Sequence, residues 1–224
     1  MVKVKICGIT NWSDARRAVE AGADFLGFNF YPKSSRYIAP AAARRIVQRL
    51  PAGVTSVGVF VNEPEREMLA IARQVGLDYV QLHGDEPPEV VSRMRRSFRV
   101  IKAIRVRGTF RAAQMASFKG ASSILLDGYD SRLRGGSGKS FDWKLAKRAG
   151  RTRQIFLAGG LTPENAAEAV AAARPFAIDV CSGVESRPGK KDAARMRALV
   201  AAVRGASKAR PVSSSRSIRV ARRK

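Results

Sequence analysis

The sequence predicts an α/β fold, a single (β/α)₈ TIM barrel, on the strength of three observations. Eight short apolar runs rich in β-branched residues alternate with eight longer amphipathic segments along most of the 224 residues. The strand-like runs are continuously apolar, which is typical of parallel strands buried on both faces. Eight strand–helix units close into a barrel, whereas an open doubly wound sheet commonly has fewer strands.

Each strand is expected where an apolar, β-branched run lies between turn residues. The expected strands are Val2–Ile6, Phe25–Phe30, Ser56–Val61, Tyr79–Leu82, Val100–Ile104, Ser123–Leu126, Gln154–Leu157 and Ala177–Val180. Strict alternation with helices implies parallel strands joined by right-handed crossovers.

The helices are expected over the amphipathic segments between these runs. They are Ser13–Ala21, Ala41–Leu50, Pro64–Val75, Pro87–Arg96, Thr109–Phe118, Trp143–Ala149, Pro163–Ala172 and Asp192–Val203. Gly22, Gly76 and Gly150 stand where a left-handed residue commonly ends a helix. Thr162 before Pro163 predicts an N-cap followed by proline at the first helical position.

The composition is that of a globular protein with a large basic excess. Lys and Arg number 42 against 18 Asp and Glu, a net charge of +24, and 45% of residues are hydrophobic. Residues 205–224 contain no acidic residue and few apolar ones, so we expect a basic, disordered tail after a barrel domain of residues 1–204. The remaining charge favours an anionic substrate, nonspecific contact with nucleic acid, or simply a basic surface.

The sequence also bears on compartment and partners. No apolar run reaches the roughly 18–20 residues of a membrane helix, and the N-terminus resembles a strand rather than a signal peptide. Two cysteines fit a reducing environment and lack metal-ligand spacing. We therefore expect a cytoplasmic protein without a membrane partner or a metal site.

Reactive side chains gather at the carboxyl ends of the expected strands, where barrel enzymes place their active sites. They are Cys7, Asn29, Arg36, His83, Asp127 and Asp179. Taken singly, each has an ordinary explanation, since a cysteine is often a small buried hydrophobe and an aspartate often a turn residue. Their common position on one rim favours a catalytic site.

Glycines cluster in the loops after the last three strands. These loops contain Gly136, Ser137, Gly138, Gly159, Gly160, Ser182 and Gly183. Glycine allows backbone N–H groups to approach an anion, and loops after strands seven and eight often bind phosphate in this fold. The pattern favours a phosphate site over ordinary tight turns.

Nine stretches occur in an order that resembles the phosphoribosylanthranilate isomerase family. They are Lys5–Thr10 (KICGIT), Gly22–Asp24 with Gly27–Phe28, Phe30–Ile38 (FYPKSSRYI), Val57–Asn62, Val80–Glu86 (VQLHGDE), Leu126–Asp127, Gly135–Trp143 (GGSGKSFDW), Leu157–Asn165 and Asp179–Glu185 (DVCSGVE). The resemblance covers residues 1 to about 203.

The resemblance implies an Amadori rearrangement in tryptophan biosynthesis. N-(5-phosphoribosyl)anthranilate would become 1-(2-carboxyphenylamino)-1-deoxyribulose 5-phosphate, without a metal or organic cofactor. Cys7 would be the general base and Asp127 the general acid, while Arg36 would hold the anthranilate carboxylate. His83 and Asp179 would also contact the substrate. A thiol of ordinary pKa, about 8.5, would need a cationic or hydrogen-bonding environment to act as this base.

Three features depart from the family pattern. Members usually carry serine where this chain has Cys181, and an apolar residue where it has Asn29. The basic tail has no counterpart, and we expect it to be dispensable for catalysis. Because the first and last strands of a closed barrel are neighbours, Cys181 is expected near Cys7, where oxidation could inactivate the enzyme.

Two other functions stay open from the residues alone. A different phosphate-binding barrel isomerase is possible, although Cys7 with Asp127 argues against a sugar isomerase that uses two aspartates. A nucleic-acid-binding protein would explain the charge, but the basic residues are scattered and no recognition motif is present, so specific binding is not expected. Either a monomer or a homodimer fits the sequence.

Overall fold

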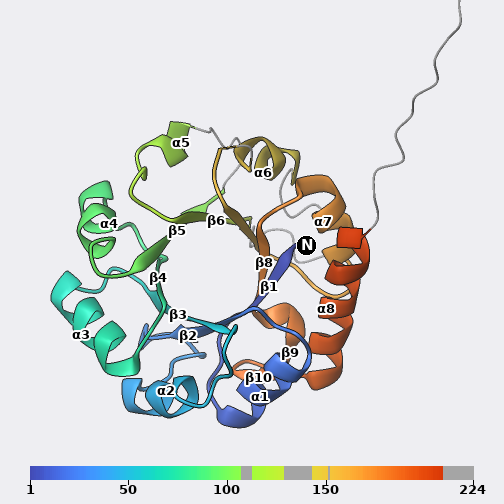
Figure 1. The fold of residues 1–224 in the computed structure, drawn as a ribbon, viewed down its shortest axis with the longest axis horizontal. Helices are drawn as coiled ribbons and strands as arrows, with labels where there is room; N and C mark the ends of the chain where they lie inside the picture. The colour runs from blue at the N-terminus through green and yellow to red at the C-terminus, as the bar shows by residue number, and fades with distance from the viewer. Residues whose placement is uncertain (107–112, 129–142, 151, 209–224) are drawn as a thin grey trace, which may run out of the picture.

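The computed structural model describes residues 1–106, 113–128, 143–150 and 152–208, and it is a closed barrel of eight parallel strands ringed by helices (Figure 1). The strands are β1 (Lys3–Ile6), β2 (Phe25–Asn29), β3 (Thr55–Phe60), β4 (Tyr79–Leu82), β5 (Arg99–Arg105), β6 (Ser123–Asp127), β7 (Ile155–Ala158) and β8 (Ala177–Val180). β1 pairs with both β2 and β8, which closes the ring. The predicted fold is confirmed.

A helix follows each strand along the chain and lies outside the barrel. The helices are α1 (Trp12–Glu20), α2 (Pro40–Val47), α3 (Glu65–Val75), α4 (Pro88–Met94), α5 (Ala113–Ala116), α6 (Trp143–Ala149), α7 (Ala166–Ala173) and α8 (Ala193–Lys208). The first four residues of the helix expected over 109–118 lie outside the described residues. Gly22 and Gly76 have the left-handed backbone expected of them, with φ of 95° and 79°, whereas Gly150 does not, so the prediction for Gly150 is wrong.

The start of α7 differs from the prediction. The helix begins at Ala166, after a turn in which the N–H groups of Asn165 and Ala166 donate to the carbonyl of Thr162 at 3.3 and 3.0 Å. The side chain of Asn165 accepts from the Thr162 N–H at 2.9 Å. Pro163 therefore lies in this turn, before the helix begins. The residue directly before α7 is Asn165, and the predicted N-cap at Thr162 is wrong.

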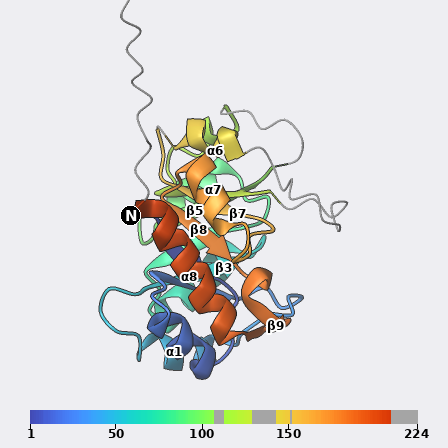
Figure 2. The ribbon, with the colours of Figure 1, turned by 90° about the vertical axis from the view of Figure 1, so that its right-hand side faces the viewer.

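The last helix extends beyond the expected domain boundary. α8 runs through Gly205 to Lys208 and packs beside α7 and α1 (Figure 2). Its end holds the first strand, because Ser207 Oγ accepts from the Val2 N–H at 3.2 Å and Arg204 donates to the Val2 carbonyl at 2.9 Å. The predicted boundary at residue 205 thus falls inside a helix, and residues 209–224 lie outside the described residues.

A short hairpin after β8 was not predicted. The 3₁₀ turn η1 (Ser182–Val184) leads into β9 (Glu185–Arg187), which pairs antiparallel with β10 (Lys190–Lys191). Gly189 makes the turn with φ of 78°, and its carbonyl accepts from the Thr10 hydroxyl at 2.7 Å. The hairpin brings Glu185 and Lys191 to the mouth of the barrel.

Side chains of the strands alternate between the helices and the barrel interior, as strand geometry requires. At the end where the strands begin, the interior is filled by aromatic rings. Phe25 lies 5.3 Å from Phe156 and 6.0 Å from Tyr79, measured between ring centroids. The polar side chains that the sequence predicted at the strand ends also point into the barrel, but they lie two or four residues after the aromatic layer. They therefore line the other end of the barrel, at the carboxyl ends of the strands.

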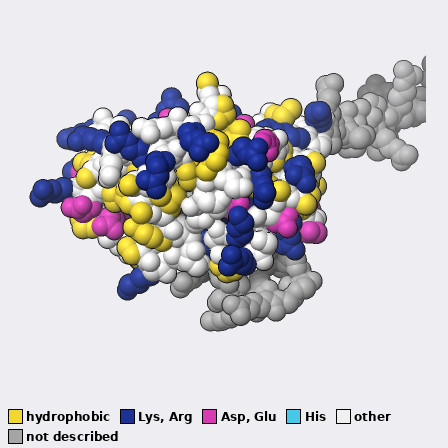
Figure 3. All heavy atoms as spheres, turned by 90° about the horizontal axis from the view of Figure 1, so that it is seen from below, with side chains coloured by type: hydrophobic (Ala, Val, Ile, Leu, Met, Phe, Trp, Pro, Cys, Tyr) yellow, Lys and Arg dark blue, Asp and Glu magenta, His cyan; other side chains and the backbone are white. Residues whose placement is uncertain are grey.

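On the face that Figure 3 shows, Lys and Arg side chains lie scattered among apolar and acidic ones and do not form one continuous basic patch. None of the described helices is long and apolar enough to cross a membrane.

Candidate active site

A cavity of about 290 Å³ opens at the carboxyl ends of the strands. It collects nearly all of the side chains that the sequence singled out. Its lining includes Cys7, Asn29, Arg36, His83, Asp127, Gly159, Gly160, Asp179, Cys181, Ser182 and Gly183. Gly136, Ser137 and Gly138 lie outside the described residues.

A larger, open depression of about 760 Å³ lies where β3, β4 and β5 begin. Its lining includes Arg95, Arg96 and Arg99, and it contains no cysteine or histidine. The chemistry-bearing side chains therefore belong to the smaller cavity, in agreement with the general position of active sites in this fold.

Cys7 follows β1 and is half-buried. Its N–H donates to the carbonyl of Val180 at 2.9 Å, which fixes it beside β8. A hydrogen bond from the Cys181 thiol has the largest effect and lowers the pKa of Cys7. Burial opposes this shift, but the charges of Lys5 and Lys191 reinforce it, so the pKa lies well below the ordinary value. The Cys7 sulfur is therefore suited to be a thiolate.

Lys5 lies two residues before Cys7 and points into the barrel. Its ammonium donates to both oxygens of Asp179, at 2.9 and 3.0 Å, and the lysine is fully buried. Burial alone would lower the pKa of Lys5, but the charges of Asp179 and Cys7 outweigh it and raise the pKa. Burial raises the pKa of Asp179 to about 6, against the opposing effect of Lys5. Lys5 therefore remains a buried cation.

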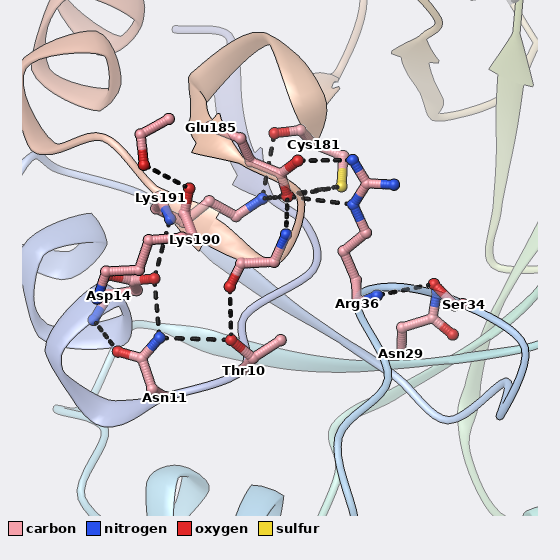
Figure 4. A network of polar contacts seen from close by, with 12 residues as sticks. Thr10, Asn11, Asp14, Asn29, Ser34, Arg36, Cys181, Glu185, Lys190 and Lys191 are labelled. Atoms are coloured by element: carbon pink, nitrogen blue, oxygen red, sulfur yellow. Dashed lines mark hydrogen bonds and ion pairs between the residues drawn. The ribbon is translucent and has the colours of Figure 1, made fainter.

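Arg36 meets the unpredicted hairpin (Figure 4). Its Nη2 and Nε donate to Glu185 at 2.6 and 3.3 Å, and Lys191 Nζ lies 2.9 Å from the same carboxylate. Lys191 also donates to the Cys181 carbonyl at 3.1 Å. Burial would raise the pKa of Glu185, but hydrogen bonds from Arg36 and Lys191 prevail and lower it. Glu185 thus holds Arg36 at the edge of the cavity.

Asn29 shapes the loop that carries Arg36. Its Nδ2 donates to Ser34 Oγ at 3.1 Å, and the same oxygen accepts from the Arg36 N–H at 3.1 Å. Asn29 Oδ1 also accepts from the Tyr31 N–H at 2.9 Å. An apolar residue could not make these bonds, so in this chain Asn29 organises the arginine loop.

His83 and Asp127 form a pair on another side of the cavity. His83 Nε2 lies 3.3 Å from Asp127 Oδ2, and Gln81 Nε2 lies 2.8 Å from His83 Nδ1. With the Gln81 amide nitrogen facing Nδ1, the ring hydrogen lies on Nε2 and is directed at the carboxylate. Asp127 is therefore held in place by a hydrogen bond from His83.

The loops after β7 and β8 expose backbone amides to the cavity. Gly159 and Gly160 have φ of 93° and 62°, a conformation that favours glycine. A Cβ on Gly183 would lie 2.0 Å from the Leu161 carbonyl oxygen. Within the described part of the chain, the N–H groups of these glycines and of Ser182 have no protein acceptor. They are available to an anion.

Sequence reasoning missed Lys5, Gln81, Glu185 and Lys191. A charged residue within an otherwise apolar strand could have pointed to Lys5, because a lysine in a barrel interior must be paired. For Glu185 and Lys191 the spacing carries no such signal, since their role depends on the hairpin.

The fold and the site together define an α/β-barrel enzyme whose reactive groups lie at the carboxyl ends of the strands. Comparison with known proteins specifies which one. Residues 4–202 match the model of the family described as N-(5'phosphoribosyl)anthranilate (PRA) isomerase. The chain is 52% identical over 201 residues to the N-(5'-phosphoribosyl)anthranilate isomerase of Citrifermentans bemidjiense, covering 90% of this chain and 96% of that protein.

Solved structures agree. The phosphoribosyl anthranilate isomerase of Thermotoga maritima superposes with a TM-score of 0.85 at 47% identity, covering 92% of this chain and all of that one. A second crystal structure, of such an isomerase in complex with reduced 1-(o-carboxyphenylamino)-1-deoxyribulose 5-phosphate, has a TM-score of 0.83 at 45% identity, with coverage of 92% and 100%. The chain belongs to the N-(5'-phosphoribosyl)anthranilate isomerase family, and it is an isomerase of tryptophan biosynthesis.

Proposed function

We propose that the chain converts N-(5-phosphoribosyl)anthranilate to 1-(2-carboxyphenylamino)-1-deoxyribulose 5-phosphate, with Cys7 as general base and Asp127 as general acid. The observation that carries this proposal is that both groups line one cavity together with Arg36. A related isomerase has been crystallised with a reduced form of this product.

The reaction needs one proton donor and one proton acceptor. Asp127 donates a proton to the furanose ring oxygen, and the ring opens to an imine of the anthranilate nitrogen. The imine makes the C2′ hydrogen acidic, and the Cys7 thiolate removes it. The resulting enolamine tautomerises to the ketone. The hydrogen bond between His83 and Asp127 supports this assignment, because it holds the carboxyl group in position in the cavity.

The other groups bind the substrate. Arg36 suits the anthranilate carboxylate, since its Nη1 is not engaged by Glu185, whereas Nε and Nη2 are. His83 and Asp179 face the sugar in this arrangement. The amides of Gly159, Gly160, Ser182 and Gly183 suit the phosphate, and we assign Gly136, Ser137 and Gly138 to the same site from the sequence alone. The mechanism requires no cofactor.

The test is the decay of anthranilate-amide fluorescence with freshly generated substrate. We expect rapid, enzyme-dependent decay in the wild type and a loss of about a hundredfold or more in Cys7→Ala and in Asp127→Asn. Arg16→Ala, on the exposed face of α1, is the matched surface control. Unchanged decay in Cys7→Ala would remove the cysteine from the mechanism, and no decay in folded wild type would refute the reaction itself.

Compartment and assembly follow as lesser proposals. Two free thiols in one site suit the reducing cytoplasm, where we place the enzyme. A monomer and a homodimer both remain compatible with the chain; the Thermotoga maritima relative is described as dimeric.

A further inference from the structure

Among the described residues, the ion-paired side chains around Cys7 carry one more positive than negative charge. The cations are Lys5, Arg36 and Lys191, and the carboxylates are Asp179 and Glu185. We propose that the Cys7 thiolate balances this buried charge cluster, and that a substrate carboxylate bound at Arg36 replaces it as the balancing anion and makes Cys7 a stronger base. The second step rests on the proposed function, because it assigns the carboxylate to Arg36.

The cluster is linked by direct contacts and withdrawn from water. Lys5 pairs with Asp179 at 2.9 Å, with side-chain exposures of 0% and 7%. Lys191 pairs with Glu185 at 2.9 Å, with exposures of 0% and 4%. Arg36 is a second cation on Glu185, at 2.6 Å, and is 25% exposed at the cavity edge. A buried group of charges is costly unless it is balanced, so the excess charge favours a nearby anion.

Cys7 lies where that anion is needed. A Cβ on Gly27 would stand 2.8 Å from the Cys7 sulfur and 3.1 Å from Lys5 Nζ, so the sulfur and the ammonium lie within about 6 Å of each other. On the far side, a Cβ on Gly8 would stand 2.9 Å from both Arg36 Cγ and the Cys181 sulfur. Lys191 Nζ is 3.7 Å from that second sulfur. The cations therefore surround the two thiols.

The count includes every titratable group that faces Cys7 among the residues that the structure describes. They are Lys5 on β1, Arg36 after β2, His83 after β4, Asp127 on β6, Asp179 and Cys181 on or after β8, Glu185 on β9 and Lys191 on β10. His83 is the hydrogen-bond partner of Asp127, and Asp127 contributes zero when it carries the proton that the proposed mechanism assigns to it as general acid. Cys181 contributes zero as a thiol, because its interaction with Cys7, together with burial, raises its pKa.

The sign of the effect follows from electrostatics. Excess positive charge stabilises the thiolate and lowers the pKa of Cys7, consistent with the lowering found for this group. When a substrate carboxylate neutralises Arg36, that stabilisation decreases and the pKa rises. A thiolate of very low pKa is a weak proton acceptor, and base catalysis is most effective when the pKa is near the working pH. The arrangement thus makes Cys7 more basic only when the substrate is in place.

The test follows the titration of Cys7 by the ¹³Cβ chemical shift of labelled cysteine, which reports thiol ionisation without turnover. Cys181→Ser assigns the two signals. The probes are the reduced product, which carries the carboxylate, and the same compound without its carboxylate. Each is added at a concentration that saturates the enzyme, as established by calorimetric titration. We expect the carboxylate probe to raise the midpoint by about one pH unit, a tenfold change in proton affinity, relative to the matched probe. Equal midpoints with the two probes would overturn the proposal.

A pair of variants tests the charge count independently. Lys5→Met removes one cation, and we expect the midpoint of Cys7 in the free enzyme to rise. Lys5→Met with Asp179→Asn removes one charge of each sign and keeps the excess, so the midpoint should return toward the wild type. A purely structural role of Lys5 predicts an equal rise in both, which would refute the count. If Lys5→Met alone does not fold, the Cys7 midpoint of the double variant and the midpoints with the two probes still test the charge count.

The outcomes are separable from those of the proposed function. If Cys7→Ala abolishes turnover while the two probes give one midpoint, the proposed function stands and this inference is wrong. If Cys7→Ala retains turnover, the proposed role of Cys7 as general base fails, while the charge balance of the free enzyme is still decided by the Lys5 variants.

Discussion

Cys7 and Cys181 lie beside each other across the seam that closes the barrel. The N–H of Cys7 donates to the carbonyl of Val180, the residue before Cys181, at 2.9 Å, and the Cys181 thiol is the strongest of the influences that lower the pKa of Cys7. The seam joins the first and last strands, so the two cysteines come from opposite ends of the chain. The expectation that they would be close is confirmed, and it has consequences for oxidation and for pH dependence.

Hydrogen peroxide should inactivate the enzyme reversibly. The Cys7 thiolate attacks the peroxide and becomes a sulfenic acid with release of hydroxide; the Cys181 thiol then displaces water and forms a disulfide. Wild type should lose two titratable thiols and regain activity with dithiothreitol. In Cys181→Ser the second step is absent, so excess peroxide should oxidise Cys7 to a sulfinic acid that dithiothreitol does not reverse. Activity unchanged by peroxide, with the disulfide confirmed by mass spectrometry, would contradict this prediction.

The acid limb of the pH–rate profile should depend on Cys181. Cys7 acts as a thiolate, so kcat/KM falls as the pH drops through its pKa. Cys181→Ala removes the hydrogen bond that lowers this pKa most. The pKa should rise and the acid limb should move to higher pH. Cys181→Ser retains a donor and should keep the limb near its wild-type position. Superimposable profiles for the two variants would show that the hydrogen bond has no influence.

The fold could be predicted from sequence because buried parallel strands produce unbroken apolar runs. Most expected strand limits fall within a residue or two of the observed ones. The β9–β10 hairpin escaped detection because its strands are only three and two residues long and are rich in charged residues. The end of α8 was misplaced because residues 205–224 contain no acidic and few apolar residues, whereas contacts of Arg204 and Ser207 with Val2 hold the last turn of the helix in place.

The site was partly predictable for the same reason. Strand ends in a barrel meet at one rim, so Cys7, Asp127 and Asp179 could be brought together without knowing any contact. The ion pairs could not be predicted from the sequence, because they depend on strand register and on the path of the loops. Lys5 meets Asp179 since the two are register partners across the β1–β8 seam, and nothing local in the sequence specifies that closure.

The position of the C-terminal cut should decide whether the barrel stays stable. A chain ending at Lys208 should keep wild-type turnover, as expected of a dispensable tail. A chain ending at Arg204 loses Ser207, which accepts from Val2 N–H and donates to the Val203 carbonyl at 2.7 Å. We expect it to be less stable by about 1–2 kcal/mol, visible as a lower Tm. Loss of turnover in the longer chain would assign a catalytic role to residues 209–224.

Asn29 should affect substrate binding more than the chemical step. Asn29→Val restores an apolar residue but removes the bonds to Ser34 and Tyr31 that shape the arginine loop. Losing them should cost about 1–2 kcal/mol of positioning, or roughly tenfold in KM, with a smaller change in kcat. Steady-state kinetics measure both. A kcat that falls while KM stays constant would instead mean that Asn29 acts in the transition state.

Gly183 should be intolerant of any side chain. A Cβ there would lie 2.0 Å from the Leu161 carbonyl oxygen, so the loops after β7 and β8 would have to separate. The amides proposed for phosphate would then lose their common direction. We expect Gly183→Ala to raise KM by tenfold or more and to weaken competition by inorganic phosphate, at a cost of about 1–3 kcal/mol in stability.

Gly205→Ala is the matched control, because Gly205 lies within α8 with open space around its Cα. It should stabilise the protein by about 0.5–1 kcal/mol. Wild-type phosphate inhibition in Gly183→Ala would exclude this loop from the phosphate site, and a KM raised equally in both variants would show that the assay reports general instability.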